Sequence, residues 1–189
     1  MQTSSQISPP RAGAQPAQTL RGAFQELHGP RLHGFALLVT LGNQTLAARI
    51  ASNALAAGTK RVNELSHPER AAAWLRRRVV REARRSRQSD GGTGSRRRAA
   101  LEDLGVNATA FAALAALDVL ERAALVASTV ERLDAGDVAT IVGQDGARLD
   151  RLIRRSRSTA ITASAPIDHG GDGGPIATRV RAVATRALR

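Results

Sequence analysis

The segment that most constrains the fold is residues 133–157, where the sequence predicts two short helices joined by a glycine turn. Apolar residues of the first helix recur at the i, i+3, i+4 spacing of one helix face: Val138, Ile141 and Val142. Asp134 stands where an N-cap is expected, with Asp137 three residues on as in a capping box. Gly143 stands where this helix should end, because glycine adopts the left-handed conformation without steric cost.

The second helix of this pair is expected to start after Asp145 and is rich in arginine. Its predicted inward face is apolar: Leu149, Leu152 and Ile153. Its other faces carry five arginines: Arg148, Arg151, Arg154, Arg155 and Arg157. Two helices with a basic second member form the geometry that places a recognition helix in the DNA major groove. The same pattern also fits a helical hairpin whose arginines only keep it soluble.

Length and composition predict an all-α fold. The chain has 189 residues, which allows one ordinary domain or two small ones. Its hydrophobic fraction is 42%, but aromatic residues make up only 2%, so the core must be built from aliphatic residues and alanine. Alanine and arginine favour helix. We predict two small helical domains joined by a flexible linker, the C-terminal one a helix-turn-helix.

The charge points to a polyphosphate partner. The formal net charge is +12, and Lys60 is the only lysine among 28 basic residues. Arginine suits bidentate phosphate contact better than lysine does. There are no cysteines, and no apolar run approaches the ~20 residues that a membrane span needs. Four histidines are scattered without metal-ligand spacing: His28, His33, His67 and His169. We therefore expect a cytoplasmic protein without enzymatic activity, cofactor, metal site or membrane association.

Changes in composition along the chain predict its organisation. From residue 76 to residue 98 there are ten arginines and two acids, interrupted by the glycine-rich residues 89–95. Glycine and serine runs are typical of flexible linkers. The predicted parts are a disordered leader (1–19), a first helical domain (20–88), a linker (89–107), a helix-turn-helix domain (108–158), and a linker with a short basic helix (159–189).

Within residues 20–88 the apolar pattern predicts three helices. One face of the first helix is expected to carry Leu27, Leu32, Phe35, Leu38, Val39 and Leu41. A break follows at Gly42 and Asn43, and Pro68 is expected near the start of the third helix, where proline is well tolerated. A further helix, in two pieces meeting near Asp118, is expected over residues 109–130.

Two blocks of residues in this order resemble a known family. The C-terminal block consists of Ala115, Leu117, Glu121, Arg122, Leu125, Glu131, Leu133, Val138, Ala139, Ile141, Val142, Gly143, Leu149, Ile153 and Arg157. The N-terminal block consists of residues 27–35, Gly42, Leu46, Ile50, Leu55, Pro68, Glu69, Ala73, Trp74, Leu75, Arg76, Arg77, Arg84 and Arg85. Together they resemble the two domains of an extracytoplasmic-function sigma factor of bacterial RNA polymerase.

The resemblance implies a transcription initiation factor that binds promoter DNA and directs core RNA polymerase to it. The recognition helix would carry the five arginines between residues 148 and 157 to the −35 element. A second helix would face the −10 element with Arg76, Arg77, Arg81, Arg84 and Arg85. The helix facing polymerase would carry Leu46, Arg49, Ile50 and Asn53. The implied partners are promoter DNA, core polymerase and an anti-sigma protein.

Two alternatives stay open. The helix that should meet polymerase lacks the family's acids, since no carboxylate lies between Glu26 and Glu64. This favours a sigma-like DNA-binding regulator that does not engage polymerase. Gly143 and Gly146 also match the glycine-x-x-glycine loop of a KH domain, which binds single-stranded nucleic acid. A KH-like RNA-binding protein would need β-structure, for which residues 160–163 are the candidate strand.

Overall fold

A computed structural model of the chain describes residues 14–65, 67–86 and 94–164. These residues form helices and turns, and no strand is found among them, which confirms the predicted all-α class. In chain order the elements are α1 (Ala14–Val39), α2 (Gln44–Thr59), α3 (Pro68–Arg85), α4 (Gly94–Glu102), α5 (Ala108–Ala115), α6 (Val119–Leu125), the π-helical turn η1 (Val126–Val130), α7 (Ala135–Val142) and α8 (Gly146–Ser164).

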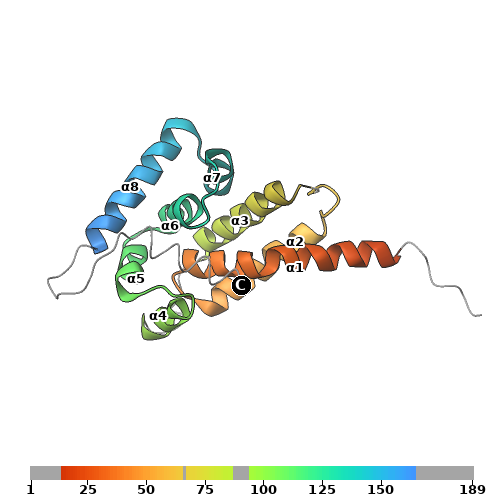
Figure 1. Cartoon of the computed structure of the whole chain (residues 1–189), viewed down its shortest axis with the longest axis horizontal. Helices are drawn as coiled ribbons and strands as arrows, with labels where there is room; N and C mark the ends of the chain where they lie inside the picture. The colour runs from red at the N-terminus through yellow and green to blue at the C-terminus, as the bar shows by residue number, and fades with distance from the viewer. Residues whose placement is uncertain (1–13, 66, 87–93, 165–189) are drawn as a thin grey trace, which may run out of the picture.

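Helices α1, α2 and α3 pack on one another in the N-terminal half (Figure 1). The predicted break between α1 and α2 is confirmed, because Gly42 has a φ of 74°. Asn43 caps α2, its side-chain oxygen accepting the Leu46 amide at 3.0 Å. Pro68 begins α3, as expected. The largest fully buried side chains of these helices are Leu32, Phe35, Val39, Ile50, Leu75 and Val79.

Three predicted helix boundaries of the C-terminal half are also confirmed, near Asp118, at Asp134 and at Gly143. Asp118 forms a capping box with Glu121, and α6 begins directly after it. Asp134 caps α7 by accepting the Asp137 amide at 2.8 Å. Gly143 ends α7 in the left-handed conformation, with a φ of 69°. Local capping chemistry therefore determines these boundaries.

The two halves are joined along α3, which lies against α7 (Figure 1). Buried side chains of both halves form one continuous core. A charged pair lies in this joint: Arg76 Nε and Nη2 donate to the two carboxylate oxygens of Glu131, at 2.6 and 2.8 Å. Glu131 directly follows η1, which continues α6, and α6 packs on α3.

Three predicted boundaries are wrong. Residues 14–19 belong to α1 rather than to a disordered leader. Residues 94–102, placed in the flexible linker, form α4, because arginine and alanine favour helix and Ala100 and Leu101 are buried. Residues 159–164 continue α8, because Ala160 extends its buried face. The candidate KH strand at 160–163 is therefore helical.

One predicted core position is also wrong. Leu27 keeps 50% of its surface exposed, because Phe24 and His28 occupy the inward face of this part of α1. The predicted basic helix over residues 175–188 and residues 1–13 lie outside the described part of the chain.

Candidate nucleic-acid interface

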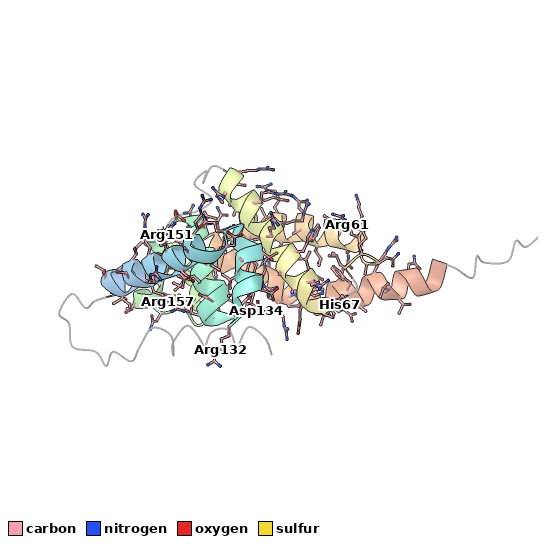
Figure 2. All side chains as sticks on the ribbon, turned by 90° about the horizontal axis from the view of Figure 1, so that it is seen from above. Arg61, His67, Arg132, Asp134, Arg151 and Arg157 are labelled. Atoms are coloured by element: carbon pink, nitrogen blue, oxygen red, sulfur yellow. The ribbon has the colours of Figure 1, made fainter. Side chains whose placement is uncertain are left out.

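Helix α8 presents an arginine-covered face from a firmly packed base. It packs on α5 and α6 through a buried face that includes Leu149, Ser156 and Ala160. Leu152 and Ile153, predicted to face inward, are half-buried. All five predicted arginines of α8 are exposed: Arg148, Arg151, Arg154, Arg155 and Arg157. Figure 2 labels Arg151 and Arg157 on this helix.

An ion pair fixes α8 to α6. Arg155 Nε lies 2.9 Å from Glu121 Oε1, and the Glu121 side chain is only 8% exposed. The other carboxylate oxygen of Glu121 accepts the backbone amide of Asp118 at 3.0 Å. Because the Arg155 side chain is still 78% exposed, it is available to a ligand as well.

Helix α7 supports α8 indirectly. It packs mainly on α3 and also on α6, whereas α8 packs on α5 and α6. Helix α6 is therefore the common support of the pair. The turn between them contains two glycines with positive φ, Gly143 and Gly146. The backbone carbonyl of Asp145 accepts the amides of Arg148 and Leu149 in the first turn of α8.

The second arginine-rich helix, α3, has exposed arginines and one buried arginine. Four of the predicted residues are exposed: Arg77, Arg81, Arg84 and Arg85. Arg76, predicted to face DNA, is instead only 6% exposed. Its guanidinium pairs with Glu131 and lies 5.6 Å from the centroid of the Phe35 ring. Because Glu131 lies directly after η1 in the C-terminal half, this ion pair joins the two halves of the molecule.

Residues around Trp74 show how other arginines of this region are used. Arg61 and Arg78 both lie over the Trp74 ring, at 5.8 and 5.2 Å from its centroid. Such cation–π contacts attach an arginine to the protein surface. Arg78 also lies 3.9 Å from Glu82. The indole, half-buried under these two side chains, is not a free platform for a stacked base.

The helix expected to face polymerase is partly engaged within the molecule. Ile50 is fully buried in the core, so its predicted surface role is wrong; it lies on the inward stripe of α2. Leu46 is half-buried. Arg49 donates to Ser86 Oγ at 3.2 Å, and the Asn53 amide donates to Glu82 at 3.3 Å. Asn53 thus contacts α3, and Arg49 contacts the C-cap residue of α3.

Sequence reasoning missed the basic residues of α4 and the buried arginine of α6. Arg96 and Arg98 are exposed on α4, and Arg98 lies 5.6 Å from the Phe111 ring centroid. Arg97 is half-buried, and Arg122 on α6 is almost fully buried. Three successive arginines stand at residues 96–98, but the flexible linker predicted for residues 89–107 gives them no structural role.

The described residues contain neither a metal-binding cluster nor a membrane-spanning helix. In the described ranges, no three or more His, Cys, Asp or Glu residues lie together as a metal site would need. None of the described helices is both long and apolar enough to cross a membrane. Comparisons with protein-family models, with curated proteins and with solved structures found no match to this chain.

Proposed function

We propose that the protein is a sigma-like transcription factor that binds promoter DNA through α8, with α6, α7 and α8 acting as a helix-turn-helix unit. The observation that carries the proposal is that all five arginines of α8 are exposed while its opposite face is buried. A helix held in this way can enter a major groove without rearranging the core. Arginine is also the usual reader of guanine edges.

Helix α3 supplies a second basic surface. Its exposed arginines are Arg77, Arg81, Arg84 and Arg85. Because α3 and α8 both pack on α6, the two basic helices belong to one packed body. We propose that both contact the same DNA molecule. The division into two domains on a flexible tether remains a prediction, and it would require the buried pair of Arg76 and Glu131 to separate.

A regulator that binds promoter DNA without engaging polymerase is the second candidate. Two observations favour it: the α2 surface contains no carboxylate, and its polar residues Arg49 and Asn53 bond to α3. In vitro transcription with core polymerase separates the two candidates. Transcripts that start at a defined site support an initiation factor, whereas DNA binding without transcripts supports the regulator.

The DNA proposal is tested with a duplex selected by the protein from a random library. Arg148→Ala with Arg151→Ala should weaken binding to the selected duplex more than binding to unselected DNA. The matched control is Arg132→Ala, which removes an exposed arginine that directly follows Glu131 after η1 and lies outside α8. Equal losses on both duplexes would mean that α8 supplies charge only. No loss on either would refute the proposal.

A further inference from the structure

Glu121 of α6 places a carboxylate beside the basic helix α8. Its side chain is only 8% exposed, so the carboxylate lies almost entirely inside the protein. One oxygen, Oε2, accepts the backbone amide of Asp118 at 3.0 Å, and the Glu121 amide donates to Asp118 Oδ1 at 2.8 Å. This reciprocal capping box fixes the carboxylate where α6 begins. The other oxygen, Oε1, is the one that lies next to α8.

Arg155 of α8 meets this oxygen through one nitrogen and keeps the rest of its guanidinium in solvent. Its Nε lies 2.9 Å from Glu121 Oε1, yet the Arg155 side chain is 78% exposed. Among the described residues, Arg155 takes part in no other ion pair. A guanidinium has five N–H groups in one rigid plane, so the two terminal nitrogens keep four donors for a ligand. Fixing Nε therefore also fixes the direction of those donors.

The position of Arg155 on α8 places these donors at the edge of the exposed face. Arg155 directly precedes the buried Ser156, and successive residues are about 100° apart around a helix. Arg151 and Arg154 instead point about 140–160° away from the buried Leu149, which is the outermost direction on α8. A helix in a major groove meets base edges with its outermost row and phosphates with its flanks. The edge position of Arg155 therefore suits a phosphate.

We propose that Arg155 is a phosphate contact of the DNA interface and that Glu121 is its positioning residue. A carboxylate that orients an arginine in the free protein reduces the entropy that the side chain loses on binding. The two terminal nitrogens then bind the phosphate as a planar fork, which lysine cannot reproduce. A phosphate held at this edge fixes the rotation of α8, so that Arg151 and Arg154 reach defined bases. The inference rests on the DNA-binding function proposed above.

Removing the Glu121 charge gives a result whose sign decides. Glu121→Gln keeps a side-chain oxygen for the capping box but no longer attracts Arg155. Loss of a negative charge near DNA by itself strengthens binding, whereas loss of the positioning contact weakens it. We expect Glu121→Gln to weaken binding to the selected duplex several-fold in fluorescence anisotropy. The matched control, Asp150→Asn, removes an exposed carboxylate from α8 itself and should strengthen binding. Glu121→Gln binding as tight as that of the parent, or tighter, overturns the proposal.

A double-mutant cycle shows whether Glu121 acts through Arg155. Arg155→Ala should weaken binding about ten-fold and lower the slope of log K against log salt by about 1, because one phosphate contact is lost. In the Arg155→Ala background, Glu121→Gln should no longer weaken binding. Losses that simply add would mean that Glu121 acts without Arg155. An unchanged salt slope for Arg155→Ala would mean that Arg155 only fastens α8 to α6. Both results contradict the proposal.

Arg155→Lys separates a positioned phosphate contact from a merely structural ion pair. Lysine keeps the positive charge and can still pair with Glu121, so the thermal midpoint should match that of the parent. A single ammonium cannot hold the carboxylate and the phosphate in the fixed plane of a guanidinium, so DNA binding should fall several-fold. Binding equal to that of the parent would show that the pair serves the fold alone. If Glu121→Gln does not fold, Arg155→Lys decides.

Failure of this inference and failure of the proposed function give different results. A parent protein that does not bind duplex DNA refutes the function proposed above, and the inference with it. If the parent binds the selected duplex and Glu121→Gln binds it equally well, only the roles of Glu121 and Arg155 are refuted.

Discussion

The two arginine-rich helices, α3 and α8, have similar compositions but different surroundings. Helix α3 packs on α1, α2, α6 and α7, so an arginine on one of its faces is inside the molecule. Helix α8 lies at one edge and packs on α5 and α6 (Figure 1), so all its arginines face outward. Arginine content therefore indicates a candidate interface only where one side of the helix is exposed. In α3 the same residue type also serves the core.

The largest expected effect is loss of the buried pair in α3. Arg76→Ala leaves the half-buried Glu131 without its partner and should lower the free energy of unfolding by about 3–5 kcal/mol. Chemical denaturation followed by circular dichroism measures this. On α8, Arg154→Ala removes an exposed, unpaired arginine and should change stability by less than about 0.5 kcal/mol.

A double replacement sharpens the same contrast. Arg76→Met with Glu131→Leu removes both charges, and it should recover much of the stability that Arg76→Ala loses. If Arg76→Ala is as mild as Arg154→Ala, the pair does not join the halves. In that case the two-domain prediction gains support.

The turn glycines of the two halves provide the second comparison. Gly42→Ala introduces strain at a φ of 74° and a clash with the Arg97 carbonyl, and should cost about 2–5 kcal/mol. Gly143→Ala carries the strain at a φ of 69°, but nothing lies within 4 Å of its Cβ position. It should cost only about 1–2 kcal/mol. Equal losses of stability in thermal unfolding would show that the Arg97 carbonyl of α4 does not lie against the turn between α1 and α2.

Features that depend on a few adjacent residues were predictable from the sequence. The cap at Asp134, the meeting of two helices near Asp118, the breaks at Gly42 and Gly143, and the all-α class are confirmed. Each follows from the backbone preference of one residue or from a short apolar period. The exposure of the α8 arginines was predictable for the same reason, since they fall off the apolar stripe.

Features that depend on packing between distant segments were not predictable. The partner of Arg76 is 55 residues away, and no local pattern identifies it. Ile50 belongs to the apolar stripe of α2, although the family resemblance places it on the surface that faces polymerase. The sequence predicts a linker where α4 lies, because this short basic helix has no clear apolar periodicity. It is stabilised by its contacts with other helices.

The two basic helices are expected to differ in their contributions to DNA affinity. Arg148→Ala with Arg151→Ala on α8 should reduce affinity for the selected duplex by about 1–3 kcal/mol and lower the salt slope. On α3, Arg81→Ala with Arg84→Ala should lower the salt slope with a smaller loss of affinity. Fluorescence anisotropy at several salt concentrations measures both. A larger loss from the α3 pair would assign the principal interface to α3 and reverse the comparison.

The smallest expected effect is a pH dependence of the unfolding free energy. It arises from His28 on α1, whose pKa is lowered in part by Arg76 of α3. Burial, followed by the charges of Arg76 and Arg31, lowers the pKa of His28, whose ring lies 4.6 Å from that of Phe24. The folded state therefore resists protonation at this site more than the unfolded state does. Stability is fully present above the unfolded pKa of about 6.5, and it is lost as pH falls toward the folded value.

Replacing the imidazole tests this directly. His28→Leu should flatten the fall in unfolding free energy between pH 7 and pH 5, by about 1.4 kcal/mol for each unit of pKa difference. Helix α8 contains no histidine, so its DNA contacts should not follow this titration. If His28→Leu leaves the pH dependence of the unfolding free energy unchanged, the loss of stability at low pH arises from another group. In that case His28 on α1 does not make the packing around Arg76 dependent on pH.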